Sequence, residues 1–255
     1  MKADEEQRGG HVRVEPCRKR VRTYLAGHAV ADTCHPLLVW EIAHYPTYYF
    51  PVGDVLAELT PTGRTLPSRK RGPADIFDVR AGGTTAPSAA RRYPSSPVEL
   101  LRGYVRFEWP AMGEWLEEDE PVYAHPRDPY HRVDILASSR LVRVALDGVT
   151  IAASACPRIL FETGLPPRYY LPLADVRTEL LRPSATQTCC PYKGTASYWS
   201  VDTGQRVHPD IMWMYRAPLP ESQKIAGLAC FYDEKADLVV ESQPPAPNGQ
   251  APGRP

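Results

Sequence analysis

Short runs that alternate apolar and polar residues recur along the chain, and they predict β-strands rather than long helices. Residues 141–146 (LVRVAL) and 149–153 are separated by Asp147-Gly148, a dipeptide that favours a type I′ hairpin turn. Residues 21–25 and 28–31 form a similar pair around Ala26-Gly27. Further strands are predicted over residues 195–201, 211–215 and 225–231. Together with 28 prolines and 17 glycines, this pattern indicates a mostly-β, loop-rich protein.

The pattern occurs twice. Residues 36–59 (PLLVWEIAHYPTYYFPVGDVLAEL) return as residues 157–180 (PRILFETGLPPRYYLPLADVRTEL), and the shift from Pro36 to Pro157 is 121 residues. This period is far longer than the roughly 20 to 50 residues of solenoid or propeller repeats, so it predicts two full domains. The predicted organisation is a disordered tail (1–11), a first repeat (12–117), a linker rich in acids and prolines (118–131), a second repeat (132–241) and a disordered Pro/Gly tail (242–255).

Prolines predict the local structure in the middle of the second repeat. Pro166, Pro167 and Pro172 bracket residues 168–171, which we expect to form a short strand at a sheet edge because proline cannot donate to a sheet. Residues 173–181 (LADVRTELL) have apolar residues at helical spacing and predict one or two helical turns that end before Pro183.

The charge balance excludes several classes of partner. The 30 basic and 30 acidic residues leave no global field for nucleic acid or an acidic membrane surface. The first residues lack the apolar core of a signal peptide, and no run approaches the roughly 18 apolar residues of a membrane span. We expect a cytoplasmic protein with no nucleic-acid or membrane partner, and the oligomeric state stays open.

The cysteines do not predict a metal site. The six cysteines are Cys17, Cys34, Cys156, Cys189, Cys190 and Cys230. None of them forms a Cys-x-x-Cys knuckle, and the histidines show no metal spacing, so we expect neither a metal nor a cofactor. Adjacent cysteines on a strand point to opposite faces, so free thiols are expected.

Residues 189–199 (CCPYKGTASYW) form the most distinctive motif of the chain. With ETGLPPRYYLPLADVRTELL upstream, this motif resembles the bacterial and fungal family called domain of unknown function 427. The resemblance continues downstream through Trp213, Tyr215, Pro218, Ile225, Gly227 and Phe231. It covers residues 133–241 of the complete second repeat. The first repeat resembles the family more loosely, matches best over residues 103–109 (GYVRFEW), and lacks the Cys-Pro-Tyr-Lys-Gly element, so we interpret it as degenerate.

The resemblance implies a β-tent fold in each repeat: two small antiparallel sheets that meet at an angle, with one short helix. This fold is similar to the ligand-binding domain of cereblon and to methionine sulfoxide reductase B. Several such relatives bind zinc through two Cys-x-x-Cys knuckles, which this chain lacks. The family commonly has histidine at the position of Cys189, and it carries a nucleotidyltransferase label.

The motif also contains the candidate chemistry. Lys193 lies beside the flexible Gly194 and could present a cation to an anionic group, or it could be a solvated loop lysine. A nearby ammonium would favour the thiolate of Cys190 and make it a nucleophile, unless Cys190 is a small buried residue. Tyr170 and Tyr192 are further candidates for catalysis and binding, respectively.

Aromatic residues are unusually dense in the second repeat. They are Tyr169, Tyr170, Tyr192, Tyr198, Trp199, Trp213 and Tyr215. On a concave sheet they would line a small-molecule pocket, although about half would be ordinary core. We therefore predict a ligand site formed by Tyr170, Cys190, Tyr192, Lys193 and Tyr198, with a shallower or filled surface around residues 70–72 of the first repeat.

Glu162 and Asp175 recur in the first repeat as Glu41 and Asp54, so both are expected to serve the fold. Asp175 is interpreted as a helix N-cap or first-turn carboxylate. Glu162 could be a buried acid paired with Arg143.

Three functions remain open on the sequence. The leading hypothesis is that the second repeat binds a small polar or anionic molecule. The first alternative is a nucleotidyl or other group transferase that uses Lys193 with Cys190 or Tyr170, although no carboxylate cluster for Mg²⁺ is evident. The second alternative is a protein-interaction module that uses an exposed sheet edge.

Overall fold

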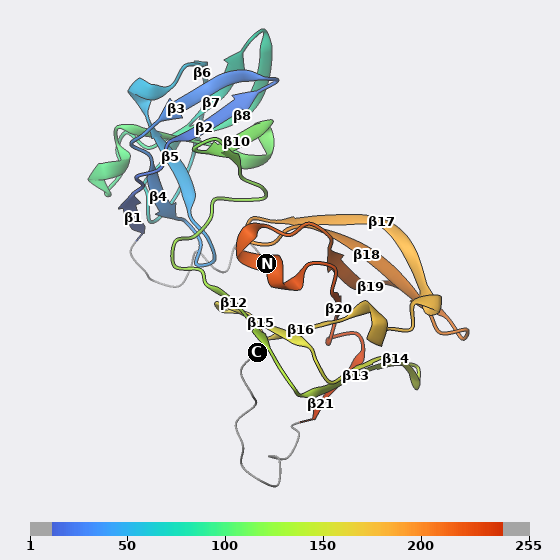
Figure 1. Ribbon diagram of the computed structural model, residues 1–255. Coiled ribbons are helices and arrows are strands. Elements are labelled where there is room, and N and C mark those ends of the chain that lie inside the picture. The colour runs from blue at the N-terminus through green and yellow to red at the C-terminus, as the bar shows by residue number, and fades with distance from the viewer. Residues whose placement is uncertain (1–11, 242–255) are drawn as a thin grey trace, which may run out of the picture. The chain divides into compact units, whose positions relative to one another are not determined.

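The computed structural model describes residues 12–241, and it divides between Pro129 and Tyr130 into two compact units (Figure 1). Both predicted tails lie outside the described residues. Each unit pairs one large with one small antiparallel sheet, which confirms the mostly-β, two-sheet fold expected of each repeat.

The described part of the first unit, residues 12–129, contains eleven strands and three short 3-10 helices. Its strands are β1 (Arg13–Pro16), β2 (Val21–Leu25), β3 (His28–Thr33), β4 (Leu37–Trp40), β5 (Thr47–Pro51), β6 (Glu58–Leu66), β7 (Ala74–Ala81), β8 (Thr84–Arg92), β9 (Tyr104–Phe107), β10 (Glu114–Glu117) and β11 (Glu120–Pro121). Its 3-10 helices are η2 (Val52–Asp54), η3 (Glu99–Leu101) and η4 (Trp109–Ala111). The sheet orders are β1-β4-β5-β9-β8-β7-β6 and β11-β10-β2-β3.

The second unit repeats this order. Its strands are β12 (Val133–Ala137), β13 (Leu141–Leu146), β14 (Val149–Ser154), β15 (Arg158–Glu162), β16 (Arg168–Leu171), β17 (Leu181–Cys190), β18 (Gly194–Asp202), β19 (Val207–Tyr215), β20 (Ala229–Phe231) and β21 (Asp237–Glu241). Its 3-10 helices are η5 (Leu173–Asp175), η6 (Thr178–Leu180) and η7 (Pro220–Ile225). The sheet orders, β12-β15-β16-β20-β19-β18-β17 and β14-β13-β21, match those of the first unit strand for strand, except for β11.

The hairpin turns follow the stereochemistry that the sequence predicts. Asp147 and Gly148 both have left-handed backbone conformations, with φ of 50° and 77°, as a type I′ turn requires. Ala26 and Gly27 take the same conformations at the β2–β3 turn, with φ of 49° and 79°. The two copies therefore use one hairpin geometry.

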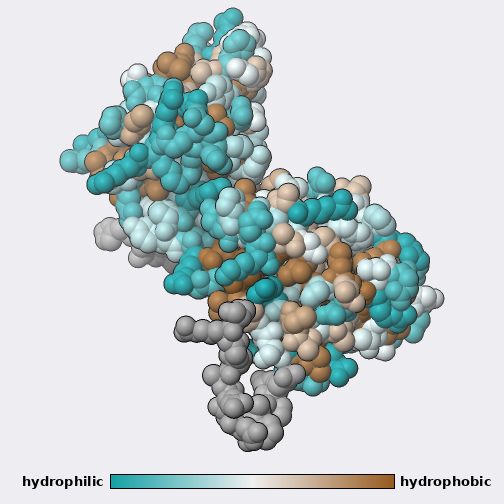
Figure 2. Space-filling view, in the orientation of Figure 1, coloured by the Kyte–Doolittle hydropathy of each residue, from teal (hydrophilic) through white to brown (hydrophobic). Residues whose placement is uncertain are grey.

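Apolar side chains on one face of each large sheet pack against the small sheet. In the second unit, Met212 and Phe231 of the large sheet are buried in one cluster with Val144 and Ile151 of the small sheet. The alternation along β13 places Val142, Val144 and Leu146 inward, because successive side chains of a strand point to opposite faces. Figure 2 shows that the visible face of the first unit is mostly hydrophilic, whereas apolar patches interrupt that of the second.

Several local predictions need correction. The strand predicted at a sheet edge, β16, lies inside the sheet between β15 and β20, because the flanking prolines fall outside the hydrogen-bonded residues. Residues 225–231 do not form one strand as predicted. Ile225 is the last residue of η7, and only Ala229–Phe231 form strand β20. The expected helical turns are the two 3-10 helices η5 and η6, and Pro183 lies in the edge strand β17, where proline is tolerated.

The segment predicted as a linker is partly folded onto the first unit. Glu120 and Pro121 form β11, which pairs with β10, and Val122 is buried in the first unit's core. Within residues 12–241, the structure has no helix that is long and apolar enough to cross a membrane.

Candidate functional site

The loop between β17 and β18 holds Lys193 in a buried position. Gly194 has a φ of +91°, a left-handed conformation that glycine adopts without steric cost. The main-chain nitrogen of Leu219 donates to the carbonyl of Lys193 at 3.2 Å, and Ser222 Oγ donates to the carbonyl of Tyr192 at 3.1 Å. The Lys193 side chain is only 11 % exposed. It is therefore not the solvated loop lysine considered as the alternative.

Lys193 forms an ion pair with Glu162 at the end of β15, whose side chain is 7 % exposed. In the sheet order, β15 lies near one edge, and β17 and β18 lie at the other. The ion pair therefore brings the β17–β18 loop to the end of a strand that is distant in the sheet order. Lys193 and Glu162 thus link two distant parts of the large sheet of the second unit.

His131 is the second partner of Glu162. Its Nε2 lies 2.9 Å from Glu162 Oε1, and its ring stacks on Tyr192 with 4.1 Å between centroids and 17° between planes. Burial opposes ionisation of Glu162, but the charge of Lys193 and the hydrogen bonds from Lys193 and His131 outweigh it and lower the pKa of this carboxyl. A residue of the predicted linker therefore completes the cluster.

The pair of Glu162 with Arg143 that the sequence suggests does not form. Arg143 Nε instead lies 3.6 Å from Glu241 Oε1. Asp175 is the first-turn carboxylate of η5, which is one of the two roles interpreted for it from the sequence, and Pro172 occupies the N-cap position. Its first-unit equivalent, Asp54, accepts a hydrogen bond from Thr33 Oγ1 at 2.5 Å. In the first unit this carboxylate therefore contacts strand β3, whereas Asp175 Oδ2 lies 3.9 Å from Cys156 Sγ.

Tyr170 and Tyr198 belong to the packed interior of the curved sheet. The register aligns Tyr198, Trp213, Cys230 and Tyr170 across β18, β19, β20 and β16. Tyr170 is 1 % exposed, accepts a hydrogen bond from Trp213 Nε1 at 3.3 Å, and has its pKa raised well above the usual range by burial. Tyr198 is 7 % exposed, with its hydroxyl 2.9 Å from Thr188 Oγ1.

Cys190 lies at the base of the loop that carries Lys193. It is half-buried at the end of β17, opposite Gly194. Burial, followed by the negative charges that Cys190 and Glu162 can carry, raises the pKa of Tyr215. Of the five predicted ligand residues, Tyr192 and Lys193 therefore join His131 and Glu162, Cys190 borders them, and Tyr170 and Tyr198 pack in the interior.

The first unit lacks the Cys-Pro-Tyr-Lys-Gly element but has a cation at the equivalent position. Arg71 precedes Gly72, which has a φ of +80°, just as Lys193 precedes Gly194. Arg71 Nη1 lies 2.6 Å from Glu41 Oε1, and both side chains are buried. The surface around residues 70–72 is thus occupied by an arginine that repeats the role of Lys193.

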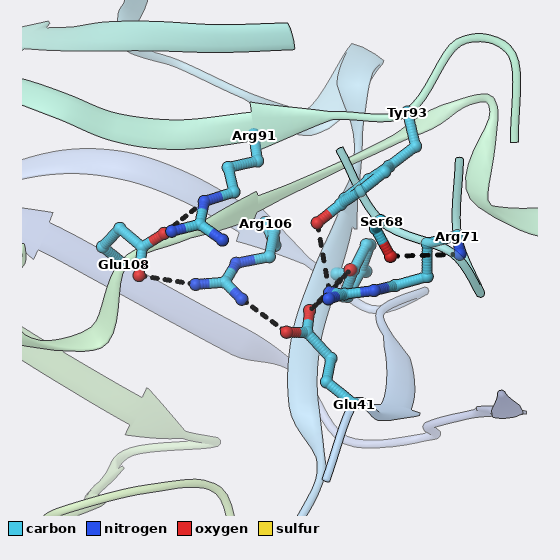
Figure 3. Close-up of polar contacts among 8 residues, drawn as sticks. Glu41, Ser68, Arg71, Arg91, Tyr93, Arg106 and Glu108 are labelled. Carbon is cyan, nitrogen blue, oxygen red and sulfur yellow. Dashed lines mark hydrogen bonds and ion pairs between the residues drawn. The ribbon is translucent and has the colours of Figure 1, made fainter. Parts of the chain in front are cut away.

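A larger charged network surrounds Glu41 (Figure 3). Arg106 Nη1 lies 2.6 Å from the second oxygen of Glu41, and the hydroxyl of Tyr49 donates to Glu41 at 2.6 Å. Glu108 then bridges Arg106 and Arg91 at 2.5 and 2.7 Å, respectively. The charges of Arg106 and Arg71 overcome the effect of burial and lower the pKa of Glu41.

Sequence reasoning missed this network. Strand register places Arg91 and Arg106 directly opposite one another, at the positions that Trp213 and Cys230 occupy in the second unit. The signal in the sequence was an arginine between two buried apolar residues, Val105 and Phe107. The alternation assigned it to the face opposite its neighbours, but only the fold shows that this face is also buried.

The two copies hold the same glutamate with different partners. Glu41 is bound by two guanidinium groups, which keep their charge and donate in a fixed planar geometry. Glu162 is bound by an ammonium and an imidazole, both of which can release a proton. The two domains therefore differ in the chemical type of the groups that hold this glutamate.

The described residues offer no evident metal centre. Within residues 12–241, no group of three or more histidine, cysteine or carboxylate side chains could hold a metal ion. The cysteines are all free thiols.

Comparison with known proteins agrees with the repeat architecture. The family model described as Domain of unknown function (DUF427) matches residues 13–118 and again residues 134–242. A search of curated proteins finds no match. The two matched ranges together span most of the chain and coincide with the two structural units. The chain therefore belongs to the DUF427 family and carries two tandem copies of its domain.

Proposed function

We propose that the second domain binds a small anionic molecule at the surface formed by His131 and Tyr192 above the Lys193–Glu162 ion pair. The observation that supports this proposal is the exchange of partners between the copies. Where the first domain fixes its buried glutamate with two arginines, the second uses a lysine and a histidine. A purely structural contact is already provided by two arginines in the first domain, so the lysine and imidazole of the second domain suggest an additional role.

The charge of the cluster favours an anion. Lys193 and Glu162 neutralise each other, so protonation of His131 gives the cluster a net positive charge. The ring of His131 contacts Glu162 through Nε2, which leaves Nδ1 as the nitrogen that can donate to a ligand. The stacked ring of Tyr192 holds the imidazole in this orientation. An anionic group would thus gain a charge-assisted hydrogen bond from a pre-oriented donor.

The buried position of Lys193 changes which substitution tests the proposal. From the sequence alone, Lys193→Ala would be expected to weaken a ligand with little loss of stability. Because Lys193 neutralises a buried carboxylate, its removal is instead expected to destabilise the domain. His131 and Tyr192 are the better test positions, since substituting either of them keeps the ion pair.

Group transfer has less support than binding. Tyr170 is 1 % exposed and has a raised pKa, so it is a poor nucleophile. The ammonium of Lys193 is already paired with Glu162 rather than available to neutralise a phosphate.

Calorimetric titration of the full chain tests the proposal, with inorganic phosphate, sulfate, citrate and adenosine monophosphate as probes. We expect at least one anion to bind, and His131→Ala to weaken it about tenfold or more, because a hydrogen bond to a charged group contributes about 1.5 to 3 kcal/mol. Lys70→Ala is the matched control, since Lys70 precedes Arg71 as Tyr192 precedes Lys193. Absence of binding at about 10 mM of every probe, or equal losses in His131→Ala and Lys70→Ala, would refute the proposal.

A further inference from the structure

The first domain contains an aromatic groove. A cavity of about 690 Å³ lies beside η4 and β10, and its lining includes Tyr24, Trp109, Met112, Trp115, Pro121 and Tyr123. This volume is within the range of about 300 to 1,000 Å³ that is typical of ligand sites. The groove is separate from the charged network around Glu41.

The groove has a rigid floor. The rings of Trp109 and Trp115 are stacked, with 4.4 Å between centroids and 4° between planes. Trp115 is 4 % exposed, and its Nε1 donates to the carbonyl of Trp109 at 3.3 Å. Trp109 is half-buried, and Tyr123 at the rim is 43 % exposed. A buried indole thus supports a second indole that forms part of the cavity wall.

The second domain shows that the fold does not require these rings. Phe107 and Phe231 pair with β8 and β19 in the same register, so Trp109 corresponds to Asp233 two residues later. Strand pairing likewise matches Trp115 with Leu238, because their partners Thr23 and Val144 are equivalent.

Tyr24, which also lines the cavity, has no aromatic equivalent in the second domain. Tyr24 corresponds to Ala145, since they pair with Ala29 and Thr150 at the same point of the two hairpins. The same two-sheet architecture therefore closes with alanine, aspartate and leucine at these positions. Trp115 belongs to the core of the first domain, whereas Trp109 and Tyr123 are only partly buried and leave ring surface for a ligand.

One end of the groove is acidic. A neighbouring cavity of about 210 Å³ shares Pro121 and Val122 with the aromatic cavity and is lined by Glu117, Glu118 and Glu120. Glu114 lines the aromatic cavity itself. Lys19 and Arg127 are the basic residues of this lining, and Lys19 is paired with Glu117. The four carboxylates exceed the two basic groups, so the groove favours a basic ligand group at this end.

We propose that this groove binds a proline-rich peptide that carries an arginine. Prolines pack flat on indole rings, and a polyproline II segment is already ordered before binding, so it loses little conformational entropy. An arginine in the peptide would reach the carboxylates beyond Pro121. In one extended segment, the prolines would contact the aromatic end of the groove and the arginine would contact its acidic end. A purely apolar molecule would match only the aromatic end.

The sequence of this chain supplies a probe with that chemistry. Residues 242–255 read SQPPAPNGQAPGRP, with prolines throughout and a single charged residue, Arg254. A fluorescein-labelled synthetic peptide of this sequence is titrated with the full chain, and binding is followed by fluorescence anisotropy. Two control peptides replace either every proline with alanine or the arginine with glutamine. We expect the intact peptide to bind, and each control peptide to bind more weakly.

Matched protein variants identify the site. Trp109→Asp introduces the residue found at the equivalent position of the second domain. We expect it to weaken binding about tenfold, a loss typical of an aromatic anchor. The added negative charge would by itself favour the arginine of the peptide, so weaker binding would reflect the loss of the ring. Leu100→Asp is the control, because it adds the same charge at a residue of the first domain that is 58 % exposed and outside the groove lining. Tyr123→Ala and Glu120→Lys test the aromatic rim and the acidic end at exposed positions, so they do not depend on the folding of Trp109→Asp.

Several outcomes would overturn the proposal. They are no binding at about 1 mM peptide, equal binding of the proline-free peptide, and unchanged affinity in both Tyr123→Ala and Glu120→Lys. Equal binding of the proline-free peptide would point to charge attraction alone. Light scattering during the titration shows whether the natural occupant of the groove is a segment of a second copy of the chain. In that case the protein would form a dimer, and excess peptide would dissociate it.

Discussion

Replacing Lys193 with methionine is the most direct test of the buried ion pair. Methionine has a comparable length and no charge, so Glu162 keeps only the contact with His131. Both members of the pair are nearly buried, at 11 % and 7 % exposure. Breaking such a pair by removing one partner costs about 3 to 5 kcal/mol. The remaining hydrogen bond from His131 places the expected loss at the lower end, about 3 kcal/mol.

This loss should depend on pH in a defined direction. In the native protein the pKa of Glu162 is lowered, so the ion pair stabilises the fold above the unfolded pKa of about 4.3, and this contribution is lost as the pH falls through the folded pKa. Without Lys193, burial dominates and favours the protonated carboxyl, which removes the penalty at low pH. The difference between the native protein and Lys193→Met should therefore shrink as the pH falls from 7 to about 4.

Amide hydrogen exchange is the suitable assay because it resolves the two domains separately. A loss of about 3 kcal/mol speeds exchange by global opening of the second domain roughly hundredfold, while the first domain serves as the internal reference. Arg182→Met is the control, since Arg182 and Asp202 form a more exposed pair at 3.4 Å that should contribute less than about 1 kcal/mol. Adding Glu162→Gln to Lys193→Met should restore part of the stability, because no uncompensated charge then remains buried. An effect of Lys193→Met no larger than that of Arg182→Met, or one independent of pH, would contradict this reasoning.

Three further predictions concern both domains. Glu41→Gln leaves two buried guanidinium groups without their shared carboxylate, and it should destabilise the first domain by about 3 kcal/mol or more in urea unfolding, while the second domain is unchanged. Gly194→Ala should cost about 1 to 2 kcal/mol through its φ of +91° alone, because an added Cβ meets only ordinary contacts; thermal unfolding that matches the native protein would contradict this. Burial raises the pKa of Cys230, so mass spectrometry after iodoacetamide treatment at pH 8 should find it unmodified, whereas the exposed Cys189 reacts; labelling of both at equal rates would show that Cys230 is accessible.

The amino-acid sequence by itself determined the architecture of this protein. The repeat at 121 residues, from Pro36 to Pro157, predicted two copies of one domain, and the alternation of residues 141–146 predicted strand β13. The turn at Asp147-Gly148 was predicted because its stereochemistry depends on two adjacent residues. These features depend on short-range periodicity and local backbone preference, which a sequence records directly.

The tertiary structure alone decided which side chains meet. Glu162 and Lys193 are 31 residues apart, and Arg106 and Glu41 are 65 apart, so their contacts follow from sheet order and curvature rather than from spacing. For the same reason the cation of the first domain was recognised as Arg71 only when both loops were seen to reach an equivalent glutamate. A buried charged network is assembled across strands that are distant in sequence, and its members look individually like ordinary surface residues.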